Sequence, residues 1–393
     1  MWGKKYASLD ALRMMRFFDH NATTPLLPEA KAVWVETIDA HWLNPSSPYR
    51  GGAAVHARLE EARQRLGAML DVDPQRIVFN SGATEGNNAV FATWAERFGR
   101  EGRLGVGATE HPSVLEAAKR YFDGRVNWLK PAFGDGGVIE PDVTDWRGVD
   151  AISIMAANNE TGILNPWLDW AEACRGRGIS IHCDASQWIG KMPLNGLGAC
   201  DYVTACAHKF GGPKGVGFLL MPEGAGLGLA GGAQERGRRA GTEDVAGILA
   251  MLAALEAVES KRPACSGQHK ESFLAALQEA LPAVVIIGDG LPSLWNTAAV
   301  VMPDFKSPRW IRQLEKKGLL VSAGSACSTG KEGPSHVLTA MGLSPDFASR
   351  ALRISSGWAT TAEDWDALLS AMVESYRELK AEAADSGSQV ISI

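Results

Sequence analysis

The sequence lacks an excess of one charge, a long apolar run and an export signal. Its 39 Lys and Arg against 45 Asp and Glu leave a net charge of −6, which gives no reason to expect nucleic acid or an anionic membrane as a partner. No apolar run approaches the ~18 residues that cross a bilayer. The basic N-terminus lacks the apolar core and small-residue cleavage site of a secretory leader, so we expect none.

Cysteine is also scarce, and no two cysteines have CxxC spacing. This pattern argues against an intrinsic metal site and against a disulfide framework. It predicts a reducing, cytoplasmic setting in which a thiol can stay reactive. The six cysteines are Cys174, Cys183, Cys200, Cys206, Cys265 and Cys327.

The chain has 393 residues, more than one ordinary core accommodates, which predicts two domains. Helical spacing alternates with short β-branched runs, so we expect an α/β fold with a mainly parallel mixed sheet flanked by helices. We expect strands at 76–79, 104–107, 151–156, 180–183, 202–205, 215–221, 284–287, 298–302 and 352–355. Helices are expected at 28–43, 54–70, 245–260, 268–280, 308–317 and 361–384.

We expect four segments along the chain. Residues 1–16 form a flexible extension, and 17–260 form a large domain whose residues 17–30 pack near the small domain. A smaller α+β domain spans 261–384 and carries the loop of Cys327, and 385–393 form a tail.

Three constellations indicate chemistry. Residues 81–85, Ser-Gly-Ala-Thr-Glu, follow a predicted strand and open a helix, so they either bind a phosphate or merely cap the helix. Asp184 ends a predicted buried strand, where open sheets bind ligands, although it could instead cap the next helix. Lys209 follows a strand and precedes a Gly/Pro turn, a place that suits a Schiff-base lysine better than the surface role that fits Lys214.

Cys327 is the one soft nucleophile in a Ser/Gly-rich stretch, 321–330, that we expect to move freely. A Schiff-base lysine, an acid able to pair with a pyridinium nitrogen and a movable thiol together indicate sulfur chemistry on pyridoxal phosphate (PLP). The alternative is an inert loop cysteine.

The chain resembles the cysteine desulfurases, the class V aminotransferase branch of fold-type I PLP enzymes. Within them it is most similar to the group I enzymes of the nitrogenase and iron–sulfur type, which have the longer mobile cysteine loop. Segments that share order and spacing with them are 18–25, 44–47, 81–85, 109–112, 158–162, 184–187, 208–209, 238–242, 325–330, 334–338 and 353–357.

The resemblance implies a role for each matching residue. Lys209 would hold PLP and shuttle a proton, Asp184 would pair with the ring nitrogen, and His111 would stack on the ring and assist proton transfer. Cys327 would become a persulfide and could transiently bind an iron–sulfur cluster. The remaining positions would bind the ring hydroxyl (Asn159, Gln187), the phosphate (Ala83, Thr84, Cys206, His208), the phosphate of a neighbouring subunit (Thr242) and the substrate (Arg353, Asn44).

Two positions depart from the family. Cys206 stands where a serine is usual, and a thiol is the weaker donor to a phosphate, so we expect lower cofactor retention. Tyr49 lies where a histidine-containing segment is usual, and it has no role that we can assign.

The expected activity is therefore removal of sulfur from L-cysteine, giving L-alanine and an enzyme persulfide. The sulfur would pass to an acceptor such as an iron–sulfur scaffold protein or to another thiocofactor route, and Thr242 implies a homodimer. The alternatives are a selenocysteine lyase or aminotransferase of the same fold, or a non-catalytic binding protein that kept it.

Overall fold

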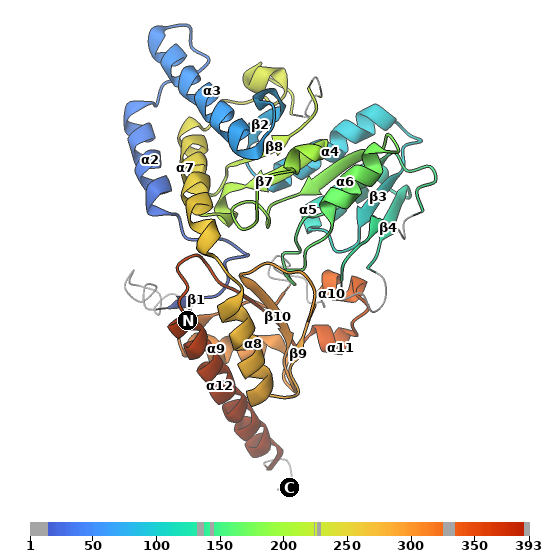
Figure 1. Ribbon diagram of the computed structural model, residues 1–393, viewed down its shortest axis with the longest axis vertical. Helices are drawn as coiled ribbons and strands as arrows, with labels where there is room; N and C mark the ends of the chain where they lie inside the picture. The colour runs from blue at the N-terminus through green and yellow to red at the C-terminus, as the bar shows by residue number, and fades with distance from the viewer. Residues whose placement is uncertain are drawn as a thin grey trace. The chain divides into compact units, whose positions relative to one another are not determined.

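The computed structural model describes residues 15–131, 137–141, 145–223, 225, 229–324 and 335–388, with side chains to residue 385. The described chain divides into two units (Figure 1). The larger unit comprises Thr23–Asn159 and Ile163–Ala264, and the smaller unit takes the remainder, including Glu160–Gly162.

A seven-stranded mixed sheet organises the larger unit, in the order β2-β8-β7-β6-β5-β3-β4. Strand β8 is antiparallel to both of its neighbours, and the other pairs are parallel. Six of the seven strands, all except β4, are buried throughout, as a sheet with both faces covered requires. The strands are β2 (Ile77–Asn80), β3 (Leu104–Gly107), β4 (Val126–Leu129), β5 (Ala151–Ser153), β6 (Ser180–Asp184), β7 (Tyr202–Cys206) and β8 (Gly217–Leu220).

Helices cover this sheet. Helix α4 packs on β7 and β8, α5 lies over β3 and β4, and α6 lies over β6. Figure 1 shows α2 and α7 side by side, with α3 against α7. The bounds are α2 (Pro28–Ala40), α3 (Arg50–Leu70), α4 (Ala83–Phe98), α5 (Pro112–Phe122), α6 (Trp167–Arg175) and α7 (Val245–Lys261), with 3₁₀ turns η1 (Pro74–Arg76), η3 (Leu197–Ala199), η4 (Ala207–Lys209), η5 (Gln234–Gly237) and η6 (Arg262–Ala264).

The smaller unit has an antiparallel sheet in the order β12-β10-β9 and a short parallel pair, β1-β11. Its core joins these strands to the long helices, with Trp310 and Trp365 among the buried residues. The strands are β1 (Arg16–Phe17), β9 (Val285–Ile286), β10 (Thr297–Val301), β11 (Leu319–Leu320) and β12 (Ala351–Ser355). The helices are α8 (Gln268–Ala280), α9 (Ser307–Lys316), α10 (His336–Ala340), α11 (Pro345–Ala348) and α12 (Ala362–Ser388).

The predicted α/β architecture with a mainly parallel mixed sheet is confirmed. Helix α3 begins at Arg50, four residues before the predicted start, because Gly51 and Gly52 are helical rather than helix-breaking. A Cβ on Gly52 would lie 2.5 Å from the Ser47 carbonyl oxygen, so close approach of the preceding loop accounts for this glycine. Strand β4 was not predicted, since it is a half-exposed edge strand without a continuous apolar run.

Candidate active site

Two parallel neighbours, β6 and β7, end at the same edge of the larger sheet, and chemistry-bearing residues follow both strands. Asp184 closes β6 and Cys206 closes β7. Open α/β sheets bind their ligands at the carboxyl ends of parallel strands, and this edge is therefore the candidate site.

Asp184 is buried and both of its carboxylate oxygens accept hydrogen bonds. Asn87 Nδ2 donates to Oδ2 at 2.9 Å, and the Ser186 amide donates to Oδ1 at 3.0 Å. The second bond is a local turn, and no helix begins after Asp184 for it to cap. The carboxylate is thus a fixed acceptor suited to a cationic ligand group.

A second buried carboxyl group, Glu110, lies close enough to Asp184 to interact with its charge. Its Oε1 accepts a hydrogen bond from the Met155 amide. Burial, reinforced by the charge of Asp184, raises the pKa of Glu110 well above its usual range. Glu110 is therefore favoured in its protonated form. Glu110 was not predicted as a site residue, and its place directly before His111 was the only signal in the sequence.

The N-terminus of α4 forms a cradle. Gly82, the residue before it, has φ of 132°, a conformation open to glycine and costly for other residues. A Cβ on Gly217 would lie 2.6 Å from the Gly82 Cα, so the two backbones meet without room for a side chain. The amides of Ala83 and Thr84, at the first turn, have no intrahelical partners. Such a helix start suits a phosphate.

Cys206 borders this cradle. Its thiol is buried and lies within hydrogen-bonding reach of the Ala83 amide and of Ser186. Burial raises the pKa of Cys206, even though the positive charge of Lys209 opposes this effect. The neutral thiol can therefore act as a weak donor beside the cradle.

Lys209 and His208 occupy the turn η4, directly after β7. Thr24 stabilises this turn through two hydrogen bonds. Its hydroxyl donates to the His208 carbonyl at 3.0 Å and accepts from the Gly211 amide at 2.7 Å. Burial and then the charge of Lys209 lower the pKa of His208 to about 4, so its imidazole is neutral. Lys209 is half-buried, and its charge acts on both His208 and Cys206.

Other predicted site residues of the larger unit differ in exposure. Gln187 is buried, and its side-chain oxygen accepts a hydrogen bond from Lys191, a buried lysine that was not predicted as a site residue. Asn159 is half-buried. Asn44 and Thr242 are exposed. Thr242 lines a small pocket with Ser81 and Arg239.

His111 caps α5 and is connected to Asp184 by hydrogen bonds through the side chains of Ser113 and Asn87. Its Nδ1 lies 2.8 Å from Ser113 Oγ, and Ser113 Oγ accepts from Asn87 Nδ2 at 2.9 Å. The structure thus brings His111 and Asp184, 73 residues apart in sequence, into one hydrogen-bonded group. Sequence reasoning missed Asn87 and Ser113, because a polar residue on a helix gives no sign of burial until its packing is known.

In the smaller unit, Arg353 lies on β12, opposite Ala299 of β10. Its guanidinium is buried and donates from Nη2 to Asp19 Oδ1 at 2.6 Å. Glu160 lies near it and accepts a hydrogen bond from Ser335. Burial raises the pKa of Glu160, against the opposing charges of His336 and Arg353. Cys327 lies outside the described residues.

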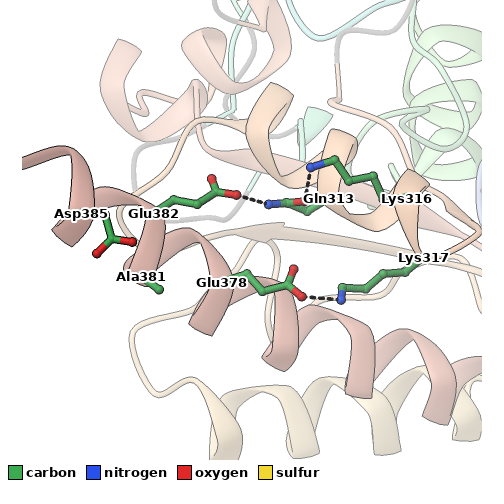
Figure 2. A pocket seen from close by; sticks show the side chains of 7 residues that line it. All are labelled: Gln313, Lys316, Lys317, Glu378, Ala381, Glu382 and Asp385. Carbon is green, nitrogen blue, oxygen red and sulfur yellow. Dashed lines mark hydrogen bonds and ion pairs between the residues drawn. The ribbon is translucent and has the colours of Figure 1, made fainter.

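The smaller unit also has a groove of about 510 Å³ between α9 and α12 (Figure 2). Its amines and acids face one another, with Lys317 Nζ 2.9 Å from both Glu374 and Glu378. Gln313 donates to Glu382 at 2.9 Å. These side chains satisfy each other, so the groove lacks the convergent polar groups of a ligand site.

Three further properties concern the described residues only. Among them, no group of three or more His, Cys, Asp or Glu side chains is placed to hold a metal ion. Five cysteines fall in the described ranges, and each of these is a free thiol. No helix in those ranges combines the length and apolar character needed to cross a membrane.

Comparison with known proteins gives a consistent result. A cysteine desulfurase from Frankia sp. (strain EuIK1) is 36% identical over 375 residues, covering 89% of this chain and 88% of that protein. A cysteine desulfurase from Klebsiella pneumoniae is 34% identical and covers 89% and 90%, respectively. Among solved structures, a NifS-like protein superposes with a TM-score of 0.83 at 30% identity, covering 92% of this chain and 98% of that one. SspA in complex with cysteine superposes with a TM-score of 0.74 at 28% identity, covering 86% and 98%.

The Aminotransferase class-V family matches residues 16–368, which cover the larger unit and most of the smaller one. Since this match spans most of the chain and the cysteine desulfurase relatives align over nearly all of it, the chain belongs to the class-V aminotransferase family, in its cysteine desulfurase branch.

Proposed function

We propose that this chain is a PLP-dependent cysteine desulfurase that converts L-cysteine to L-alanine and leaves the sulfur as a persulfide on Cys327. The observation that carries the proposal is the arrangement at the sheet edge of the larger unit. There the buried acceptor Asp184 lies at the end of β6. The neighbouring strand β7 ends at Cys206, which borders the cradle at the start of α4. The half-buried Lys209 follows directly after β7. An acid, an amine and an anion cradle are the three features that pyridoxal phosphate requires.

Each feature has a partner on the cofactor. When bound, pyridoxal phosphate draws electrons away from the substrate Cα. Asp184 would keep the ring nitrogen positively charged, and Lys209 would hold the cofactor through its amine and move the proton of the substrate Cα. Ala83, Thr84, Cys206 and His208, with Thr242 of a second copy, would hold the phosphate. Gln187 and Asn159 would bind the ring hydroxyl, and His111 would lie against the ring.

The smaller unit contributes Arg353, which binds the substrate, and Cys327, which accepts the sulfur. Arg353 binds the substrate carboxylate through a fork of two hydrogen bonds. Asn44 is proposed as a further substrate-binding residue. The Cys327 thiolate attacks the substrate sulfur, so that a sulfur–sulfur bond forms while the carbon–sulfur bond breaks. The electron pair of the broken bond stays with the carbon skeleton, which takes up protons and leaves as alanine. The overall change is cysteine plus thiol to alanine plus persulfide.

A second copy of the chain and a sulfur acceptor are the proposed partners. Four of the seven large apolar side chains that are exposed in the described chain fall within residues 35–49, with Trp42 75% exposed. Apolar surface concentrated in this way is typical of an interface, which supports a homodimer. We also propose that the acceptor is an iron–sulfur scaffold protein and that the reaction takes place in the cytoplasm, where thiols stay reduced.

The test compares the parent enzyme with Cys327→Ala in the presence of cysteine and a thiol reductant. We expect the variant to keep the visible absorbance of bound cofactor and to lose sulfide release to below about 1% of the parent rate, because the nucleophile is gone. Parallel assay of alanine distinguishes desulfuration from amino-group transfer.

Cys265→Ala is the matched control, because Cys265 is a half-buried cysteine of the same unit that forms no disulfide. It should release sulfide at the parent rate. Sulfide release at the parent rate from Cys327→Ala would refute the role of Cys327. Failure of the parent enzyme to form alanine from cysteine would refute the function as a whole.

A further inference from the structure

The hydrogen bonds around Asn87 determine which way its amide faces. Asn87 is fully buried on α4, and its side chain meets the Asp184 carboxylate at 2.9 Å. A carboxylate accepts hydrogen bonds, so the amide must present its NH₂ group to Asp184. Its carbonyl oxygen then faces Thr204, whose hydroxyl donates to it at 2.7 Å.

The hydrogen bonds of Thr204 and His182 are consistent with this orientation of the Asn87 amide. The Thr204 hydroxyl gives its hydrogen to Asn87, so it accepts at the 3.2 Å contact with His182 Nε2. His182 therefore carries its proton on Nε2, and its Nδ1 accepts from the Ser153 hydroxyl at 2.9 Å. Burial lowers the pKa of His182 to about 4, in agreement with a neutral ring.

The other side leads to His111. The second amide hydrogen of Asn87 points to Ser113 Oγ at 2.9 Å, so the Ser113 hydroxyl directs its own hydrogen to His111 Nδ1 at 2.8 Å. The Ser113 backbone amide, which can only donate, also lies 3.2 Å from His111 Nδ1. Nδ1 therefore presents a lone pair, and the proton of the neutral ring is on Nε2.

The position of His111 favours the same state. It is the N-cap of α5, an 11-residue helix, and the positive end of the helix dipole disfavours a charged imidazole there. Protonation at Nδ1 would also oppose N–H to N–H across the 3.2 Å contact with Ser113. Nearby acids, Glu110 and Asp184, act in the opposite direction, but Asp184 is already bonded to Asn87 and Glu110 is favoured in its protonated form.

We propose that Asn87 and Ser113 are positioning residues that hold His111 as the neutral Nε2–H imidazole, so that His111 acts in the reaction as a hydrogen-bond donor through Nε2. His111 then neither removes a proton at Nε2 nor serves as an imidazolium acid. This role replaces the expected one in proton transfer, which is left to Lys209. This inference rests on the proposed function, because it concerns the residue placed against the cofactor ring.

Nitrogen-15 NMR of the protein labelled at histidine measures the tautomer directly, with and without PLP and before any cysteine is added. The His111 signals are assigned as those missing from His111→Gln. We expect Nδ1 to be unprotonated and Nε2 to be protonated between about pH 6 and pH 8, the range in which an ordinary histidine loses its charge. A proton on Nδ1, or a charged ring in that range, would overturn the proposal.

Variants test the positioning role. Ser113→Ala removes one donor to Nδ1 and should lower the ratio of Nε2–H to Nδ1–H forms about fivefold, the effect of one hydrogen bond. Ser113→Thr, which restores the hydroxyl, should recover the ratio. Asn87→Ala removes the amide donor that orients the Ser113 hydroxyl, so it should also lower this ratio. An unchanged ratio in either Ser113→Ala or Asn87→Ala would contradict the proposal.

Thr93→Val is the matched control, because it removes a buried hydroxyl from α4 that bonds the Ala89 carbonyl within the helix. It should leave the His111 signals unchanged. The two proposals fail separately, because the tautomer is measured without substrate. If His111 has the wrong tautomer but the enzyme releases sulfide, this inference fails and the proposed function stands. If His111 has the expected tautomer but the enzyme is inactive, the proposed function fails and this inference stands.

Discussion

At the residue scale, Cys206 offers a direct prediction about cofactor retention. The thiol borders the cradle at Ala83, and burial favours its neutral form. Because a hydroxyl is a stronger donor than a thiol, Cys206→Ser should bind pyridoxal phosphate more tightly by about 1 kcal/mol, or roughly fivefold. Spectral titration of the cofactor-free protein with pyridoxal phosphate measures the change.

Cys183→Ser is the control for this substitution. Cys183 is equally buried and lies one residue before Asp184 on β6, but no described contact connects it with the cradle at Ala83. It should not tighten binding. Equal or weaker binding by Cys206→Ser would show that the residue is not a phosphate ligand.

Asp184 and Lys209 could be identified from the sequence because a polar side chain stands out at the end of an apolar strand or just after it. Cys206 was identified only through the resemblance to the cysteine desulfurases. Asn87 and Ser113 lie in helices, where polar residues are common on the solvent side. Only the packing of α4 against β7 turns Asn87 inward, and no local pattern records that contact.

At the scale of elements, Gly86 allows α4 to approach β7. A Cβ at this position would lie 2.8 Å from Thr204 Cγ2, closer than real side chains come. Gly86→Ala should destabilise the larger unit by about 1–3 kcal/mol through overpacking, despite the gain of about 1 kcal/mol in helix propensity. Because Asn87 follows directly, the substitution should also weaken cofactor binding. Urea unfolding and the spectral titration measure the two effects.

Gly176→Ala is a suitable comparison, since Gly176 has a helical φ of −61° and its nearest neighbour to an added Cβ is 3.6 Å away. That variant should be neutral or slightly more stable. A Gly86→Ala protein as stable as Gly176→Ala would mean that α4 can shift away from β7 without cost.

At the scale of the whole molecule, the sequence predicted two units and a mixed sheet, because alternating helical and strand patterns limit the topologies available. It did not place Glu160–Gly162, which cluster with the smaller unit although their neighbours in sequence belong to the larger one. Nor could it pair Asp19 with Arg353, 334 residues apart. Such contacts depend on tertiary packing, which a local pattern does not encode.

The stability of the larger unit should fall in mild acid because His182 is buried as a neutral ring. Burial lowers the pKa of His182 to about 4, although the charge of Asp184 opposes the shift. In the unfolded chain the pKa returns to about 6.5. The unfolded state therefore binds more protons, and stability is lost as pH falls through 6.5 toward 4. His208, also lowered to about 4 but only partly buried, adds a smaller effect of the same sign.

The expected loss from His182 between about pH 7.5 and pH 5 is roughly 2 kcal/mol. Hydrogen exchange of the β6 and β7 amides follows the larger unit alone, because these central strands open only when their unit unfolds. His182→Asn should flatten the pH dependence by that amount, whatever it costs in stability at neutral pH. His56→Gln, at an exposed position on α3, should leave the slope of the parent protein. The same slope in His182→Asn and in the parent would mean that the proton uptake on unfolding arises elsewhere.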